Sequence, residues 1–199
     1  MTQIRPPGSG AVGLVLAAGG GSRFGRPKAL VEDAAGPWLE RAARLLLDGG
    51  CHEVVVVLGA AAEEADLLVR TVPSVSSVVA HDWNRGLSAS LEAGLGRLAM
   101  TGEQAAVITL VDLPDLNAAV VARLLDRLGT DPWVVGRACF HGRPGHPVLI
   151  GRGHWDAVVA ESHGDAGARD FLDRVRAPVV ECGDLAEGKD MDAAAEPTP

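Results

Sequence analysis

Short apolar runs alternate with amphipathic segments along most of the chain, and this alternation is the strongest constraint on its fold. Two parallel strands must be joined by a crossover, which is usually a helix, so the pattern predicts an α/β fold with a mostly parallel mixed sheet. The clearest strands are predicted at residues 12–18, 53–58, 75–80 and 106–111. The clearest helices are predicted at residues 37–48, 61–70, 88–100 and 117–128, the last with Asn117 as its N-cap.

The pattern loosens after residue 133, where shorter elements are expected. Strands are predicted at residues 133–138, 148–150 and 178–182, and helices near Trp155 and Phe171. No internal repeat and no linker-like stretch interrupts the chain. We therefore expect a single domain over residues 1–199, with flexible ends at residues 1–11 and 192–199.

The composition of the chain indicates which kinds of partner it can bind and in which compartment it is expected. The 199 residues are 47% hydrophobic, which is enough for a sizeable core, and the net charge of −8 argues against a nucleic-acid surface. The cysteines are odd in number and lack paired spacing, which predicts neither a disulfide framework nor a zinc cage; they are Cys51, Cys139 and Cys182. With no signal peptide and no run long enough to span a membrane, we expect a cytoplasmic protein.

The first apolar run ends in three consecutive glycines, Gly19 to Gly21, followed by Ser22, Arg23 and Lys28. Glycines allow main-chain N–H groups to approach an anion closely, and the two cations can neutralise its charge. The stretch matches neither the dinucleotide fingerprint nor the P-loop, because the glycine spacing and the Gly-Lys-Ser/Thr ending are absent. A bare connector with solvated charges is the alternative, but the cations favour a polyphosphate site.

A second chemical feature follows the predicted strand at residues 106–111, where Asp112 stands at the strand tip. Ligands of open α/β sheets lie outside the carboxyl ends of the strands, and a carboxylate there suits Mg²⁺ bound to phosphates. Asp112 as a simple turn residue remains the alternative. Asp190 and Asp192 could supply a further metal ligand or belong to a solvated acidic tail.

Three loop segments could contact substrates. Residues 81–90 include Ser88 and Ser90 at a predicted helix start, where they could read a base or sugar, although a plain N-cap by Ser88 is favoured slightly. Residues 142–147 and 164–169 could hold a second substrate, although as isolated motifs they are typical of turns.

Five segments together resemble the MobA-like nucleotidyltransferases, and within that family the molybdenum cofactor cytidylyltransferases. The matching segments are LAAGGGSRFGRPKAL, DWNRGLSASLEAGL, VDLP, RPGHPVLI and GDAGAR. The family has a three-layer Rossmann-like fold. Ala17-Ala18-Gly19 resembles the cytidine-using branch, since the guanine-using branch usually has Ala-Gly-Gly there.

The resemblance implies a role for particular residues. It implies that Arg23 and Lys28 hold the triphosphate as catalytic cations, that Asp112 binds Mg²⁺, and that His146 and Asp165 lie toward the second substrate. Implied nucleotide contacts are Leu16, Ala17, Ala18, Gly19, Gly20, Gly21, Ser22, Arg23, Lys28, Arg85, Gly86, Ser88 and Ser90. Asp190 or Asp192, with Asp192 slightly favoured, is the implied second metal ligand.

Two features depart from the family pattern. Val111 replaces the glycine that relatives commonly have before the metal aspartate, and the C-terminal motif lacks its usual Thr-Pro after Asp192. The second departure leaves the second metal ligand open.

The resemblance implies transfer of CMP from CTP to the terminal phosphate of molybdopterin-bound molybdenum (molybdenum cofactor), with release of pyrophosphate. A molybdenum hydroxylase is then a candidate recipient of the product. Two alternatives stay open: a nucleotidyltransferase acting on another phosphorylated acceptor, and a non-catalytic carrier or insertion chaperone for the cofactor. No nucleic acid and no membrane partner is expected.

Overall fold

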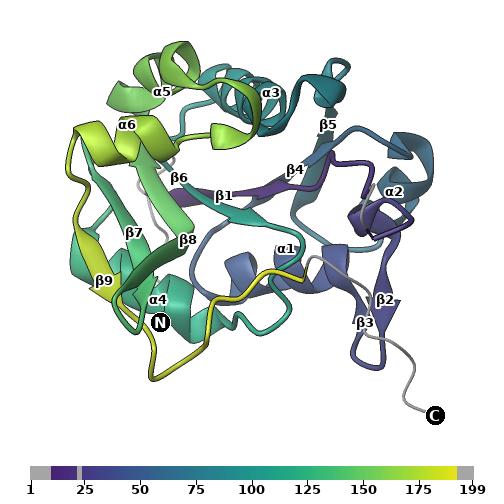
Figure 1. The fold of residues 1–199 in the computed structure, drawn as a ribbon, viewed down its shortest axis with the longest axis horizontal. Helices are drawn as coiled ribbons and strands as arrows, with labels where there is room; N and C mark the ends of the chain where they lie inside the picture. The colour runs from purple at the N-terminus through teal and green to yellow at the C-terminus, as the bar shows by residue number, and fades with distance from the viewer. Residues whose placement is uncertain (1–9, 22–23, 192–199) are drawn as a thin grey trace.

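The computed structural model describes residues 10–21 and 24–191, which form a mixed sheet between two layers of helices (Figure 1). The sheet has the order β5-β4-β1-β6-β8-β7-β9. Its strands are β1 (Ala11–Leu16), β4 (Val54–Leu58), β5 (Val75–Val79), β6 (Ala105–Leu110), β7 (Val135–Phe140), β8 (Arg143–Gly151) and β9 (Val179–Glu181). The predicted α/β fold is confirmed.

The sheet divides into a parallel half and a mixed half. β1 lies between β4 and β6 and is parallel to both, with Leu14 opposite Val55 on one side and Ile108 on the other. β8 runs antiparallel to β6 and to β7, whereas β9 is parallel to β7. The parallel pairs place the carboxyl ends of β1, β4 and β6 along one edge of the sheet.

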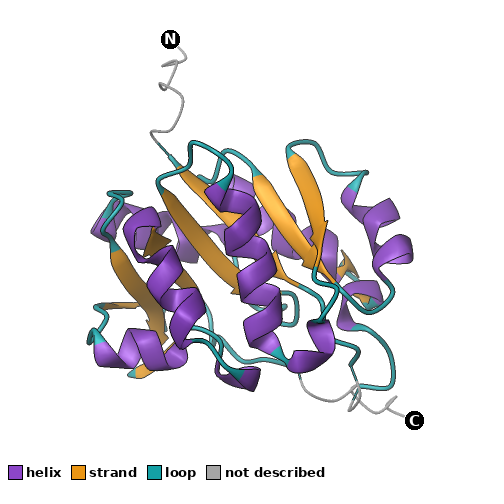
Figure 2. Ribbon diagram, turned by 90° about the horizontal axis from the view of Figure 1, so that it is seen from above, coloured by secondary structure: helices purple, strands orange, loops and turns teal. Residues whose placement is uncertain are grey.

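Helices cover both faces of the sheet (Figure 2). One layer contains α1 (Trp38–Asp48), α2 (Ala62–Val69) and α4 (Ala118–Leu128), and the other α3 (Leu87–Ala99), α5 (Trp155–Glu161) and α6 (Arg169–Arg174). β1 is buried along its whole length and alternates between the two cores, since Val15 packs in the first and Leu14 in the second. Burial on both faces explains its continuous apolar sequence.

Helix starts test the expected caps. Asn117 caps α4 as predicted, because its side-chain Oδ1 accepts a hydrogen bond from Ala119 N at 3.0 Å. The expected N-cap at Ser88 is wrong: α3 already begins at Leu87, and Gly86 with φ +103° occupies the cap position without a side-chain cap. A backbone angle in that region favours glycine. The start of α3 is therefore set by the turn at Gly86 and not by a capping side chain.

The mixed half differs most from expectation. The stretch 142–147, expected as a turn, is mostly strand: β8 begins at Arg143, five residues before the predicted start. A tight turn at His141 and Gly142, both at positive φ, folds β8 back onto β7 and lets Arg143 pair with Phe140. A small hairpin of β2 (Glu32–Asp33) and β3 (Gly36–Pro37) was not predicted.

The chain ends also differ slightly from expectation. Ala11, assigned above to a flexible end, is buried and begins β1. The expected flexible segments at residues 1–9 and 192–199 lie outside the described residues. Among the helices of residues 10–21 and 24–191, none combines the length and apolar character that crossing a membrane requires.

Candidate functional site

The glycine stretch lies at the carboxyl end of β1, between the ends of β4 and β6. Ala17 N donates to Val57 O at 2.9 Å, and Val111 N donates to Leu16 O at 3.3 Å. Gly21 has φ +63°, and a Cβ there would lie 1.8 Å from Arg26 O, so the turn requires glycine. Gly19 has open space where a side chain would be. The loop therefore offers accessible backbone beside the sheet edge.

Lys28 and Asp112 meet at this edge, although they are 84 positions apart in the chain. Lys28 belongs to the 3₁₀ helix η1 (Lys28–Leu30), which is anchored by buried Ala29. Asp112 lies two residues after Leu110, the last residue of β6. The Lys28 Nζ and Asp112 Oδ2 atoms are 2.6 Å apart, and both side chains are mostly buried. Ser22 and Arg23, the other polar members of the predicted phosphate site, lie outside the described residues.

The C-terminal segment returns to the same edge of the sheet. Met191 N donates to the Asp112 backbone carbonyl at 3.0 Å. Asp190 precedes this contact and has an exposed side chain. Asp192 lies outside the described residues. The structure thus brings at least one of the two C-terminal aspartates next to the loop of Asp112.

A cavity of about 390 Å³ adjoins this edge on the side of β8. Its apolar wall comes from leucine, isoleucine and valine side chains of β1, β6, β8, α3 and α6. Its charged and titratable lining residues are Arg137, His146, Asp165, Arg169 and Asp190. The cavity therefore combines a mainly apolar body with a few ionic groups, as small-molecule sites commonly do.

His146 is held by a backbone contact with β6. Its Nδ1 lies 3.3 Å from Ile108 O, and because a carbonyl can only accept, Nδ1 carries the proton and Nε2 keeps its lone pair. Burial lowers the pKa of His146, while the Ile108 hydrogen bond and the Asp112 charge act in the opposite direction. The imidazole is therefore neutral at physiological pH.

Asp165 closes the cavity at the start of α3. It belongs to the 3₁₀ helix η4 (Gly164–Ala166), and its Oδ1 accepts a long hydrogen bond of 3.4 Å from Leu87 N. A Cβ on Gly86 would lie 2.6 Å from the same oxygen, so glycine is needed for this approach. Asp165 thus already stabilises the N-terminus of α3, besides lining the cavity.

The structure brings together only part of the predicted set. Among the predicted residues that it describes, those lining the cavity are Leu16, His146, Asp165 and Asp190. Arg85 is exposed and lies 3.7 Å from Asp82 and 3.8 Å from Glu92. Ser88 and Ser90 are buried within α3 and do not line the cavity.

One cavity cation, Arg137, was missed as a site residue. Arg137 lies in β7, where its Nη2 contacts Asp173 Oδ1 at 2.7 Å. Its buried Nε has no hydrogen-bond partner among the residues that the structure describes. The available signal was a single charge within an otherwise apolar strand. Arg169, which also lines the cavity, is the last residue of the GDAGAR segment that was expected near the second substrate.

A separate group of possible metal ligands lies at the opposite edge of the sheet. Ligand atoms of His52, Glu53 and Glu103 all lie within 4.8 Å of one another, just before the starts of β4 and β6. His52 Nε2 contacts Glu103 Oε1 at 3.1 Å. Because parallel strands run away from this edge, the group is remote from Lys28 and Asp112.

Comparisons with known proteins agree with this architecture. An α/β sheet with a glycine loop and charged residues at the carboxyl ends of its parallel strands is typical of nucleotide-binding proteins. The model of the MobA-like NTP transferase domain matches residues 13–179. The chain therefore belongs to the MobA-like NTP transferase family and is a nucleotidyltransferase in the broad sense.

Individual relatives differ in their described activities. The chain is 38% identical over 190 residues to a nicotine blue oxidoreductase of Paenarthrobacter nicotinovorans, covering 90% of this chain and 91% of the relative. A manganese complex of Rv0371c from Mycobacterium tuberculosis is 25% identical, with a TM-score of 0.65 and 87% of each chain covered. A nucleotidyl transferase from Methanothermobacter is 20% identical with a TM-score of 0.78, covering 94% of this chain and 93% of that one, and shows the shared fold.

Proposed function

We propose that this chain is a Mg²⁺-dependent cytidylyltransferase that transfers CMP from CTP to the terminal phosphate of molybdenum cofactor, releasing pyrophosphate. The observation that carries the proposal is the 2.6 Å contact of Lys28 with Asp112 beside the glycine loop. The carboxyl edge of the sheet thus combines a cation, a carboxylate and accessible main chain in the glycine loop. Such groups can bind a polyphosphate and neutralise its charge. The Ala17-Ala18-Gly19 form supports the choice of cytidine.

The donor atoms at this edge fit a hard divalent cation. Asp112 and Asp190 offer carboxylate oxygens, which Mg²⁺ and Mn²⁺ prefer over nitrogen or sulfur ligands. The manganese complex of the mycobacterial relative supports the same choice. When bound, the ion would neutralise the negative charge of the polyphosphate. Asp112 and the C-terminal aspartates would hold it, with Asp192 as a candidate beside Asp190.

The remaining residues position and neutralise rather than exchange protons. The Lys28 ammonium is confined near Asp112, so it is preorganised to contact the phosphates of a bound nucleotide. Arg23 is proposed to do the same. A phosphate monoester has a second pKa of about 6 and is mostly ionised at neutral pH, so it needs no strong general base. Neutral His146 would then orient the acceptor by accepting, at Nε2, a hydrogen bond from an N–H or O–H group of the acceptor.

Pyrophosphate release tests the proposal directly. The purified protein is incubated with CTP, GTP, ATP or UTP, with and without molybdenum cofactor. We expect release that requires both CTP and the acceptor. Release with CTP and another phosphorylated acceptor would favour a different nucleotidyltransferase, and tight cofactor binding without release would favour a carrier.

A second candidate is an oxidoreductase activity on nicotine blue, and the 38% identity with the nicotine blue oxidoreductase favours it. The mainly apolar cavity beside His146 is compatible with such a ligand. Anaerobic bleaching of nicotine blue, with a reduced nicotinamide dinucleotide as the two-electron donor, measures this activity. Bleaching without pyrophosphate release from any nucleotide would replace the cytidylyltransferase proposal.

A further inference from the structure

The segment from Cys182 to Met191, here called the C-terminal strap, crosses the molecule without forming a helix or strand of its own. It connects β9 to the loop of Asp112 (Figure 1). Because it has no ladder of backbone hydrogen bonds, its path depends on contacts with other elements. These contacts occur at its start, its middle and its end.

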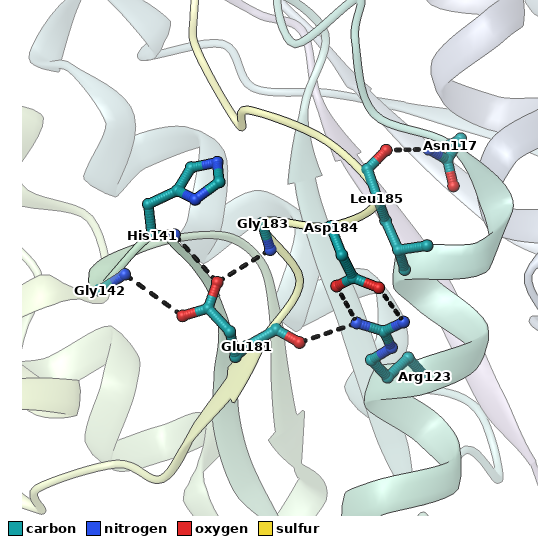
Figure 3. Close-up of polar contacts among 8 residues, drawn as sticks. All are labelled: Asn117, Arg123, His141, Gly142, Glu181, Gly183, Asp184 and Leu185. Carbon is teal, nitrogen blue, oxygen red and sulfur yellow. Dashed lines mark hydrogen bonds and ion pairs between the residues drawn. The ribbon is translucent and has the colours of Figure 1, made fainter.

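At the start of the strap, Glu181 binds three backbone N–H groups (Figure 3). Its Oε1 accepts from His141 N at 2.9 Å and from Gly183 N at 2.8 Å, and its Oε2 accepts from Gly142 N at 3.2 Å. His141 and Gly142 form the turn between β7 and β8. One carboxylate therefore ties the first residues of the strap to that turn.

In the middle, α4 holds the strap through Arg123 and Asn117 (Figure 3). Arg123 Nη1 and Nη2 pair with Asp184 Oδ1 and Oδ2 at 2.5 and 2.8 Å, and Nη1 also donates to Glu181 O at 3.0 Å. Asn117 Nδ2 donates to Leu185 O at 2.8 Å. Because the guanidinium and the carboxylate form a bidentate pair, they fix the orientation of the Asp184 side chain as well as its distance from α4.

At the end, the strap meets the loop that carries Asp112. Asp115 Oδ2 accepts hydrogen bonds from Glu187 N and Gly188 N, both at 2.8 Å. Met191 N then donates to Asp112 O at 3.0 Å. The strap thus leads from the Arg123 contact to the position where Asp190 lies next to the loop of Asp112.

We infer that Arg123 is a positioning residue for the cation site: through Asp184 it fixes the strap that carries Asp190 toward Asp112. That Asp112 and Asp190 bind a metal ion rests on the proposed function. Arg123 is on the outer layer of helices and is not among the residues that line the cavity. Its effect on the cation must therefore pass through the strap.

The experiment measures cation binding without turnover. Free Mn²⁺ is titrated with the full chain by electron paramagnetic resonance, in the absence of nucleotide. Arg123→Ala is expected to weaken Mn²⁺ binding about tenfold, the range seen when groups that orient metal ligands are removed. Hydrogen exchange at the amides of Glu187, Gly188 and Met191 is expected to accelerate in the same variant.

Two further variants keep the inference testable if Arg123→Ala folds poorly. Arg123→Lys keeps the charge but loses the paired geometry, so binding between that of the parent and that of the alanine variant is expected. Asp184→Asn removes the charge from the strap side and is expected to shift Mn²⁺ binding in the same direction by a smaller factor.

Arg44→Ala is the matched control, since Arg44 pairs with Glu40 within α1 at 2.8 Å. It should leave Mn²⁺ binding and strap exchange at parent values. Parent-like binding in Arg123→Ala, an equal loss in Arg44→Ala, or no Mn²⁺ binding by the parent would overturn the inference. Absence of pyrophosphate release with an intact strap response would refute the proposed function alone.

Discussion

The parallel half and the mixed half of the sheet build their parts of the site in different ways. At the end of β1, the glycine turn and Lys28 come from one continuous stretch, because a tight turn around an anion needs consecutive residues. In the mixed half, the cavity wall combines β7, β8, η4 and the C-terminal strap. The residues proposed to bind the nucleotide (the nucleotide end) therefore form a motif that can be recognised in the sequence, whereas those proposed to bind the acceptor (the acceptor end) come together only through tertiary folding.

The largest expected effect lies where the two halves meet, at Asp112. Asp112→Asn should lower divalent-ion-dependent pyrophosphate release about a thousandfold, because the carboxylate charge that would hold the cation is lost. Thermal melting should be close to that of the parent, since asparagine has nearly the same size and keeps a side-chain oxygen that can accept from Lys28 Nζ. A variant that keeps a near-normal rate would remove Asp112 from the proposed chemistry.

Lys28→Ala should affect the nucleotide end alone. Loss of one charge contact to the phosphates is expected to lower pyrophosphate release about a hundredfold, roughly 3 kcal/mol at the transition state. Binding of the acceptor, measured by titration without nucleotide, should change little. An unchanged rate with CTP would contradict the phosphate assignment.

Arg137→Met, unlike Lys28→Ala, should weaken binding of the acceptor and leave use of the nucleotide unchanged. Removing this cavity cation is expected to raise the KM for an anionic acceptor about tenfold, in line with the cost of one charge-assisted hydrogen bond. The KM for CTP should stay at the parent value, and Arg137→Lys should recover part of the loss. Equal changes for both substrates would mean that the two ends are not separate.

The smallest expected effect is on the stability of the fold at acidic pH, through Glu181 at the start of the C-terminal strap. Hydrogen bonds, first from Gly183 N and then from His141 N, lower the pKa of Glu181 from 4.5 to about 2. A depressed pKa stabilises the fold above 4.5, and this stabilisation is lost as the pH falls from 4.5 toward 2. Urea unfolding should therefore lose stability more steeply over that range in the parent than in Glu181→Gln. Parallel pH profiles would refute this contribution.

Sequence reasoning recovered most of the parallel half. Apolar periodicity placed β1, β4 and β6 within a residue or two, since strands buried on both faces have few alternatives. Asn117 was identified as a cap because its side chain acts on the adjacent turn. Lys28 and Asp112 were each predicted to belong to a site at the carboxyl ends of the strands, but their direct contact was not predicted.

The mixed half shows where such reasoning ends. β8 was shortened because proline and glycine at residues 144–147 resemble a turn, whereas pairing with β7 extends the strand. Arg137 was missed because only the folded sheet places it at the cavity. Ser88 and Ser90 looked available for binding, but α3 buries them. These outcomes depend on contacts between distant segments, which local patterns do not encode.

Pyrophosphate release from CTP, measured for the parent and for Lys28→Ala and Asp112→Asn in the presence of molybdenum cofactor, tests the central assignment most directly. We predict divalent-ion-dependent release by the parent and severe loss in both variants. Release that is absent from the parent with every nucleotide, or that persists in both variants, would contradict the assignment of this edge of the sheet to nucleotidyl transfer.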